Sequence, residues 1–271
     1  MGVQPLQAVN LSDLFAHPKP LIGMVHLLPL PGSAGYRGDM DTAIKRALAD
    51  VAALEGAGFD GAIVENFGDV PYRVGSNQTE SRVAMARIVC EVSHVCSIPL
   101  GVNVQFNDYE AELAIARFCG ASFFRVEVFV DNVATPGGFC PACAPELSRL
   151  RAASGGAPPY IFADIHVKET TLIAPTTLEV SAKNAETAGA DALIVTGSGT
   201  GEATPLDDVR RVKQASVLPV LVGSGLTVAT APQVLAVADG AIVGSSTKVG
   251  GIVTNPVDPV AAALMVRAAR G

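Results

Sequence analysis

The sequence predicts a single-domain α/β protein folded as a (β/α)8 TIM barrel. Three observations support this prediction: a recurring helix-end-then-strand phrase, eight strand-like runs separated by helical patterns, and polar residues where those runs end. The phrase is clearest in EGAGFDGAIVENF (55–67), CGASFFRVEVF (119–129), TAGADALIVTGSG (187–199) and VADGAIVGSS (237–246). Self-similarity of this kind indicates one supersecondary unit that is used repeatedly.

Eight apolar runs are expected to form the strands of one parallel sheet. They lie at 21–27, 61–67, 99–106, 122–130, 160–168, 192–197, 219–225 and 240–246. Eight alternating β/α units in about 250 residues match the count and length of a TIM barrel. An open doubly wound sheet is the alternative, but it needs a Gly-rich first turn, and LLPLPGSAGY is not that motif. We expect the barrel to span 20–271, with 1–19 as an extension whose short helix, SDLFAH, closes the barrel bottom.

Helical patterns occupy the gaps between these runs. In the segment 39–58, apolar residues recur at 3.6-residue spacing, acids open the first turn and glycines mark the end. The expected buried face of this helix comprises Ile44, Ala47, Leu48, Val51 and Leu54. The segment 79–95 repeats the design, and the residues expected to face inward there are Val83, Ala86, Val89 and Val92. A shorter helix is expected over 146–153.

The composition indicates which kinds of partner the protein can bind. Of the 271 residues, 49% are hydrophobic and 17% charged, and the net charge is −7. No stretch is rich in Lys and Arg, so we expect no nucleic-acid partner, whereas a small anion can still bind in a locally positive pocket. No apolar run reaches the roughly 18 residues of a membrane span, and we expect no membrane insertion and no signal peptide. Five scattered cysteines fit a reduced, cytoplasmic protein better than a disulfide framework.

The run DIHVK (164–168) places three ionisable residues at alternate positions of an apolar strand. Alternate strand residues point into a barrel, and a strand rises about 3.3 Å per residue. We therefore expect Asp164 deepest, His166 above it and Lys168 at the mouth. A structural charge network is the alternative, but buried ionisable groups are costly unless they are paired or used. The three residues are accordingly predicted to be catalytic, with Glu65 as a further acid/base candidate.

Other strands also end in polar residues, and no comparable set is expected at the opposite ends. On the second strand, Glu65 and Asn66 are adjacent, so only one of them can point into the barrel. On the third strand Asn103 and Gln105 point to the same side, and on the fourth strand Arg125 and Glu127 do so. This asymmetry is typical of the catalytic face of a TIM barrel. The residues expected to bind substrate are His26, Asn66, Asn103, Arg125, Glu127 and Thr196.

The last two strands end in PVLVGSG (219–225) and GAIVGSS (240–246). Barrel enzymes often bind phosphate in the loops after strands seven and eight, where small residues let backbone N–H groups approach the oxygens. The alternative is that these are tight turns that need glycine. We expect a phosphate site formed by Gly223, Ser224, Gly225, Gly244, Ser245 and Ser246.

The pattern demands no cofactor, and a divalent metal ion is the one candidate. Its ligands would be Glu65, Asp164 and His166, but a metal-free acid/base site needs the same residue types. Cys140 and Cys143 have CxxC spacing without a second pair nearby, so two free thiols are expected rather than a zinc site.

Taken together, several of these stretches resemble the BtpA/SgcQ family over about 20–265: IGMVHLLPLPGS, GAIVENFGDVPY, PLGVNVQFND, DIHVK, DALIVTGSGTG, PVLVGSG and GAIVGSS. The resemblance implies a TIM-barrel-like fold; one member is linked to photosystem I biogenesis, and another lies in a sugar-metabolism operon. Residues on the family's motifs are His26, Glu65, Asn66, Asp69, Asn103, Asn107, Asp164, His166, Lys168, Thr196, Ser198, Ser224 and Ser246. The sequence departs from the family around GGFCPACAPEL, a loop that could alter substrate choice.

The function expected first is acid/base chemistry, of the isomerase, epimerase or lyase type, on a small phosphorylated metabolite such as a sugar phosphate. Asp164 would orient His166 or hold a metal, while a Schiff base on Lys168 ranks lower because a rim lysine keeps its hydration. The second hypothesis is a non-catalytic assembly or stability factor for a membrane complex. The third is nucleoside or glycoside transfer or hydrolysis, with Glu65 and Asp164 as the carboxylate pair. A homo-oligomer is expected in each case.

Overall fold

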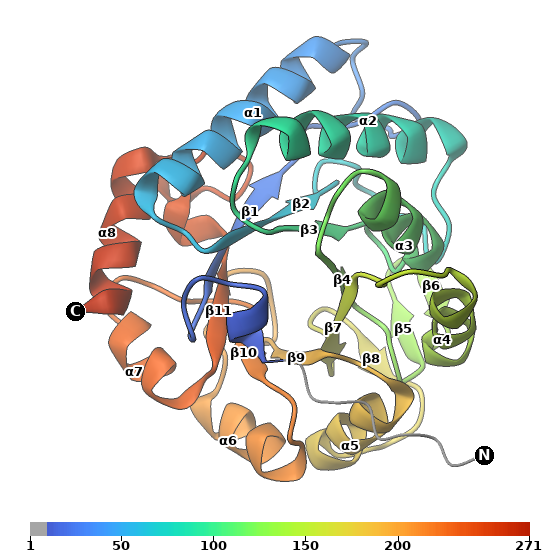
Figure 1. Ribbon diagram of the computed structural model, residues 1–271. Coiled ribbons are helices and arrows are strands. Elements are labelled where there is room, and N and C mark those ends of the chain that lie inside the picture. Colours follow the sequence, from blue (N-terminus) through green and yellow to red (C-terminus); the bar gives the residue numbers. More distant parts are fainter. Residues whose placement is uncertain (1–9) are drawn as a thin grey trace.

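In the computed structural model, which describes residues 10–271, eight parallel strands close into a barrel, as the sequence predicts (Figure 1). Their order around the barrel is β1-β11-β10-β9-β7-β4-β3-β2. The strands are β1 (Leu21–His26), β2 (Gly61–Glu65), β3 (Leu100–Asn103), β4 (Phe123–Val126), β7 (Tyr160–Ile165), β9 (Ala192–Val195), β10 (Val220–Val222) and β11 (Gly240–Val243). Several end earlier than expected, so polar residues that were placed within strands lie in the loops that follow.

Within the same described residues, eight α-helices surround the strands (Figure 1). They are α1 (Met40–Ala57), α2 (Thr79–Val95), α3 (Tyr109–Phe118), α4 (Ala144–Ala153), α5 (Leu178–Ala188), α6 (Leu206–Ala215), α7 (Ala231–Val237) and α8 (Pro259–Arg270). The side chain of Asp39 caps the first turn of α1, and Gly58, at a φ of 90°, ends the helix in the left-handed conformation that favours glycine.

The predicted inward face of α2 is wrong by one position at its start. Val83 is 63% exposed, whereas Ala84, Met85, Ile88, Val89 and Val92 are buried. Val89 and Val92 therefore face the core as expected, and the buried stripe begins at Ala84 and Met85 instead. An apolar residue at the edge of a helical stripe does not by itself show which side of the stripe packs.

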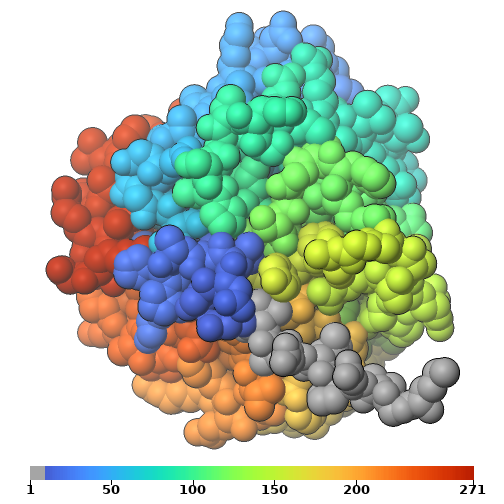
Figure 2. Space-filling model, viewed as in Figure 1, coloured from blue at the N-terminus to red at the C-terminus, as the bar shows by residue number. Residues whose placement is uncertain are grey.

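The bottom of the barrel is closed by the segment that precedes β1. The short 3-10 helix η1 (Leu11–Asp13) buries Leu11, and Phe15 packs edge-on against Phe123 inside the barrel, with ring centroids 5.7 Å apart. Figure 2, viewed as Figure 1, shows this dark-blue segment lying over the middle of the ring of helices. Residues 1–9 of the expected 1–19 extension lie outside the described residues.

Acidic residues also lie at the bottom of the barrel, so the expectation of no polar set at the strand N-terminal ends is wrong. Asp60, Asp191 and Asp239 each accept a hydrogen bond from a backbone N–H in the first two residues of a neighbouring strand, at 2.7, 2.7 and 3.0 Å. Each also pairs with a basic side chain: Arg270, Arg151 and Lys213, respectively. These carboxylates satisfy strand-end donors, and polarity at one end of a strand is not by itself evidence of catalysis.

A small antiparallel sheet, read from the sequence only as a long loop, stands beside the top of the barrel. It consists of β5 (Val133–Thr135), β6 (Gly138–Cys140) and β8 (Thr171–Leu172), in the order β6-β5-β8. The sheet joins the loop after β4 to the loop after β7. Val133 and Cys140 are buried in a cluster with Val128 and Val167, which fixes these two loops against each other.

The cysteines differ from the expectation that all are free. Cys90 in α2 and Cys119 after α3 are paired as a disulfide, while Cys140 and Cys143 are free and buried. Burial raises the pKa of the Cys140 thiol to about 12. Among the helices within residues 10–271, none combines the length and the apolar character that crossing a bilayer requires.

Candidate active site

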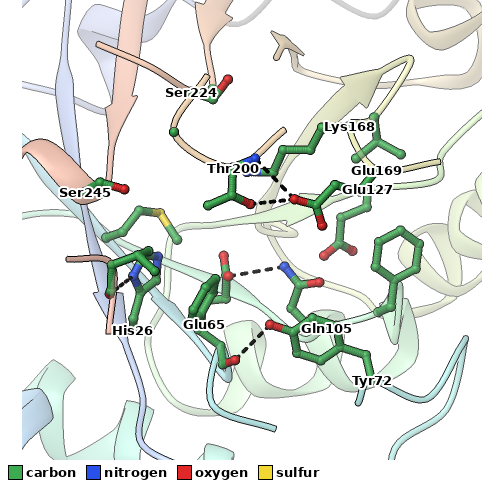
Figure 3. Close-up of a pocket in the computed structure, with 18 of the residues that line it drawn as sticks. His26, Glu65, Tyr72, Gln105, Glu127, Lys168, Glu169, Thr200, Ser224 and Ser245 are labelled. Carbon is green, nitrogen blue, oxygen red and sulfur yellow. Dashed lines mark hydrogen bonds between the residues drawn. The ribbon is translucent and has the colours of Figure 1, made fainter. Parts of the chain in front are cut away.

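The carboxyl ends of the barrel strands surround a cavity of about 470 Å³ (Figure 3). On one side lie the loops after β10 and β11, marked by Ser224 and Ser245, and on the other lie Gln105 and Tyr72. Glu65 and Glu127 face the space between them. A cavity with a mostly apolar lining and a few convergent polar groups is the usual form of a small-molecule site.

Eleven of the sixteen predicted site residues line this cavity. They are His26, Glu65, Arg125, Glu127, Lys168, Gly223, Ser224, Gly225, Gly244, Ser245 and Ser246. The other five do not line it: Asn66, Asn103, Asp164, His166 and Thr196.

Asp164 points into the barrel as expected, but its carboxylate binds Arg125 rather than His166 or a ligand. The guanidinium donates two hydrogen bonds to the carboxylate, at 2.8 and 2.7 Å, and both side chains are almost completely buried. Because this bidentate pair occupies both carboxylate oxygens, Asp164 neither orients His166 nor offers a free carboxylate. The predicted Glu65–Asp164 pair for glycosyl chemistry is therefore not assembled.

The predicted alternation along DIHVK is wrong at His166. Strand β7 ends at Ile165, and His166 has a φ of 51°, a left-handed conformation that breaks the period of two. Its Nε2 lies 3.1 Å from the hydroxyl of Ser181 in α5. Its side chain therefore lies between the barrel and a helix, and Lys168 reaches the cavity without it.

The sequence left open whether Glu65 or Asn66 points into the barrel, and the structure shows that Glu65 does. Glu65 lines the cavity, whereas Asn66 accepts a hydrogen bond from the Gln105 backbone at 2.7 Å and donates one to Asp69 at 3.0 Å. Asn66 thus ties the loop after β2 to the loop after β3.

Thr196, another residue expected to bind substrate, is buried, and its hydroxyl has no hydrogen-bond partner within residues 10–271.

Asn103 lies under the cavity and bridges two buried acids. Its Nδ2 is 3.0 Å from Glu127 Oε1 and 3.2 Å from Glu112 Oε1. The second oxygen of Glu112 has no hydrogen-bond partner within residues 10–271. Burial raises the pKa of Glu112 well above its ordinary value, and the neighbouring Glu127 adds to this. The protonated form of Glu112 is therefore more favourable than that of an isolated carboxyl group.

Three acids line the cavity, Glu65, Glu127 and Glu169, and of these Glu65 and Glu127 are buried. Burial raises the pKa of Glu127 to about 8, against the opposing effect of Arg125. Burial also raises the pKa of Glu65, while Arg125 and Lys168 lower it. Glu127 therefore keeps a proton that it can donate near neutral pH, and the raised pKa of Glu65 makes its carboxylate a stronger base than an isolated one.

His26 is held in one orientation at the cavity wall. Its ring stacks on Phe67 with centroids 4.5 Å apart, and Nδ1 lies 3.0 Å from the carbonyl oxygen of Val253. A carbonyl only accepts, so Nδ1 carries the proton and Nε2 is left as an acceptor toward Gly244. Burial and the nearby Lys248 lower the pKa of His26 to about 3. The imidazole is therefore neutral at physiological pH and can accept a hydrogen bond from a substrate hydroxyl.

The predicted phosphate residues lie together, although their hydroxyls differ in availability. Ser224 Oγ accepts from the Gly197 N–H at 2.7 Å and donates to the Glu202 carbonyl at 2.9 Å, and Ser246 Oγ donates to the Leu226 carbonyl. Ser245 begins the 3-10 helix η2 (Ser245–Thr247), and its hydroxyl has no hydrogen-bond partner within residues 10–271. Ser245 is therefore the serine of this group whose hydroxyl is free to meet a ligand.

The residues proposed to hold a metal do not fit one. His166 faces a helix, both oxygens of Asp164 bind Arg125, and only Glu65 of the three lines the cavity. Over residues 10–271, no group of three His, Cys, Asp or Glu side chains is arranged to hold a metal ion.

Several cavity residues were not predicted as ligands. Gln105 Nε2 donates to Glu65 at 3.2 Å, and the Tyr72 hydroxyl donates to the Phe67 carbonyl at 2.8 Å. The turn between β5 and β6 also lines the cavity, through Thr135–Gly137. Gln105 could have been found, because it is in phase with Asn103. The turn between β5 and β6 could not have been predicted, because strands of three residues are too short to give a recognisable alternating pattern.

Comparison with known proteins assigns the chain to a family. A family model described as the BtpA family matches residues 17–271. An uncharacterized protein of Pyrococcus abyssi is 42% identical over 88% of this chain and 91% of its own length. The photosystem I biogenesis protein BtpA of Synechocystis is 35% identical over 96% of this chain and 91% of its own length.

Solved structures share the fold at low identity. Tryptophan synthase from M. tuberculosis has a TM-score of 0.62 at 16% identity, covering 96% of this chain and 95% of that one. N-(5'-phosphoribosyl)anthranilate isomerase from Pyrococcus furiosus has a TM-score of 0.55 at 15% identity, covering 93% and 98%. N-acetylmannosamine-6-phosphate 2-epimerase from Clostridium perfringens has a TM-score of 0.54 at 14% identity, covering 90% and 93%. These likenesses show the fold alone. The match to the family model and the two relatives identify the protein more closely: the chain belongs to the BtpA family.

Proposed function

We propose that the protein is an enzyme that performs acid/base chemistry, of the isomerase, epimerase or lyase type, on a small phosphorylated metabolite such as a sugar phosphate. The observation that supports this most is that one cavity has Gly/Ser loops on one side and ionisable side chains on the other. Two Gly/Ser loops line one side, and Glu65, Glu127 and Lys168 reach the same space from other strands. A substrate held at one end by its phosphate would present its carbon skeleton to these groups.

The proposed phosphate site rests on backbone donors. Ser245 and Ser246 open η2, where the first N–H groups of a helix have no intrahelical partner. Gly244 leaves space beside them, since a Cβ there would come no nearer than 3.4 Å to His26. Small residues with free N–H groups and one free hydroxyl, that of Ser245, suit phosphate oxygens.

Proton transfer is assigned to the two buried acids that line the cavity, Glu127 and Glu65. Glu127, with a pKa raised to about 8, would supply a proton to a carbonyl or leaving-group oxygen. Glu65 would exchange a proton on the other part of the substrate, and the neutral His26 would accept from a hydroxyl. The phosphorylated substrates named for the isomerase and the epimerase of the same fold are consistent with this proposal.

A non-catalytic role is the second candidate, and one relative favours it. The Synechocystis protein, 35% identical over most of the chain, is named for photosystem I biogenesis. In that role the cavity residues would be replaceable, and no small phosphorylated compound would need to bind.

The phosphate site is tested by thermal stabilisation. The protein is melted with inorganic phosphate, sugar phosphates and nucleotides, each beside its unphosphorylated form. A ligand at 100 times its Kd stabilises the folded state by about 2.7 kcal/mol, so binding is readily detected. We expect at least one sugar phosphate to stabilise the protein. We also expect Ser245→Asp to remove that stabilisation, because its carboxylate would repel the phosphate.

The matched control is Ser12→Asp, which adds the same charge at the exposed bottom of the barrel. It is expected to keep the ligand-induced shift. Ser224 and Ser246 are less suitable positions, since their hydroxyls hold backbone carbonyls. If no phosphorylated compound stabilises the wild type, the enzyme proposal fails and the assembly role gains support.

A further inference from the structure

Lys168 is the cavity lysine that has no partner. It lines the cavity just after β7, and its ammonium group makes no hydrogen bond or ion pair within residues 10–271. The other deeply placed lysine, Lys248, is engaged: it donates to the Met24 carbonyl at 2.7 Å and lies 3.5 Å from Asp50. A structural role explains Lys248, but no contact of this kind explains Lys168.

The backbone fixes where Lys168 projects. His166 and Glu169 on either side have φ values of 51° and 59°, both in the left-handed region. Left-handed residues other than glycine cost free energy and persist only where the surroundings hold them. Glu169 is held by Thr200, whose N–H and hydroxyl donate to its carboxylate at 3.2 and 2.9 Å. This loop geometry turns His166 toward Ser181 of α5. It leaves Lys168 facing the cavity (Figure 3).

The surroundings of Lys168 favour its neutral amine. Burial lowers its pKa, and the positive charge of Arg125 lowers it further, while Glu65 and Asp164 oppose the shift. Arg125 is locked in the same wall by Asp164 and keeps its charge. Desolvation and a neighbouring cation are the two ways in which proteins make lysine a nucleophile. Lys168 is half-buried and therefore less hydrated than a lysine at the rim was expected to be.

We propose that Lys168 is a nucleophile that forms an imine with a phosphorylated aldehyde or ketone in this cavity. The inference rests on the proposed function and narrows its substrate class to carbonyl compounds. Nζ attacks the carbonyl carbon, a C–N bond forms, and the C=O π electrons move to oxygen, which takes a proton. That proton comes from the nitrogen, so a neutral carbinolamine forms. Its hydroxyl then leaves as water with the proton of the Glu127 carboxylic acid, while the nitrogen lone pair forms the C=N bond. The balance is amine, carbonyl and carboxylic acid giving protonated imine, water and carboxylate.

The imine would then promote the chemistry already proposed. Once protonated, it withdraws electrons from the adjacent carbon, so a C–H or C–C bond there breaks more easily. Glu65, on the neighbouring wall, is placed to receive the proton. An epimerase, an isomerase and a lyase can all use this step, and the bond that breaks depends on the substrate.

The test is reductive trapping. The full-length protein is incubated with glyceraldehyde 3-phosphate, dihydroxyacetone phosphate or ribose 5-phosphate and sodium cyanoborohydride. Intact mass and peptide mapping then locate the adduct. We expect one adduct on the peptide that contains Lys168, at a yield at least ten times lower in Lys168→Arg and Lys168→Met. The control Lys183→Arg removes an exposed lysine of α5 and should keep the adduct. Melting of each variant establishes that it is folded.

The outcomes separate this inference from the function on which it rests. A compound that stabilises the wild type but gives no Lys168 adduct overturns the imine and leaves the phosphate site standing. An adduct spread evenly over the surface lysines, or one that persists in Lys168→Met, also overturns it. If unphosphorylated dihydroxyacetone gives the same Lys168 adduct and no phosphate compound stabilises the protein, the nucleophile stands and the phosphate proposal fails.

Discussion

Replacing Asp164 with alanine is expected to lower the free energy of unfolding by about 3–5 kcal/mol. The substitution leaves the guanidinium of Arg125 buried without its bidentate partner, since both hydrogen bonds to Asp164 disappear. Chemical denaturation with a two-state fit measures the loss. The removed carboxylate is completely buried, and alanine offers no acceptor in its place.

Two further variants show whether the loss comes from the uncompensated charge. Glu91→Ala breaks an exposed i,i+4 pair with Arg87 and should cost less than about 1 kcal/mol. The double variant Arg125→Met/Asp164→Leu removes both charges and should recover much of the stability that Asp164→Ala loses. A double variant no more stable than the single one would show that the barrel interior needs the shape of this pair rather than its charge balance.

Folding stability is expected to fall as the pH rises from about 4.5 to about 8, with Glu127 as a main cause. The folded protein holds a proton on Glu127 up to a pKa of about 8, whereas the unfolded chain releases it near the ordinary value of 4.5. Between these values the folded state binds more protons, so the unfolding free energy decreases with pH. Each pH unit within this window costs about 1.4 kcal/mol for a group that titrates fully.

The comparison that isolates this effect is Glu127→Gln, which cannot titrate. Denaturation of both proteins at several pH values should give a shallower decline for Glu127→Gln. The exposed control Glu91→Gln should keep the wild-type slope, because its carboxylate is solvated in both states. An unchanged slope in Glu127→Gln would mean that Glu127 is already ionised in the folded protein, and it would then be a base rather than the acid assigned here.

The barrel was predictable because its signals are local and repeated. Parallel strands are covered on both faces, so they read as short Val/Ile/Leu runs, and the glycine at position 58 ends α1 in the left-handed conformation that only small residues adopt easily. The same repetition located the carboxyl ends of the strands. Most of the cavity-lining residues that were predicted follow from that one inference.

The failures arose where a strand ended or where a partner was distant in sequence. Alternation predicts a side chain's direction only within a strand, and the left-handed φ of His166 lies just beyond the end of β7. Arg125 and Asp164 are 39 residues apart, so no local sequence pattern predicts their ion pair. The carboxylates at the bottom of the barrel were missed for the same reason, since Asp191 lies 30 residues from the strand N–H that it accepts from.

The central claim is tested most directly by a crystal structure of the protein with the phosphorylated compound that stabilises it most. We predict that the phosphoryl oxygens lie within hydrogen-bond distance of the backbone N–H groups of Ser245 and Ser246. The carbon skeleton should then extend toward Glu127 and Lys168. A phosphoryl group bound instead at Arg125, or a compound bound outside the barrel mouth, would contradict the proposed division of the cavity.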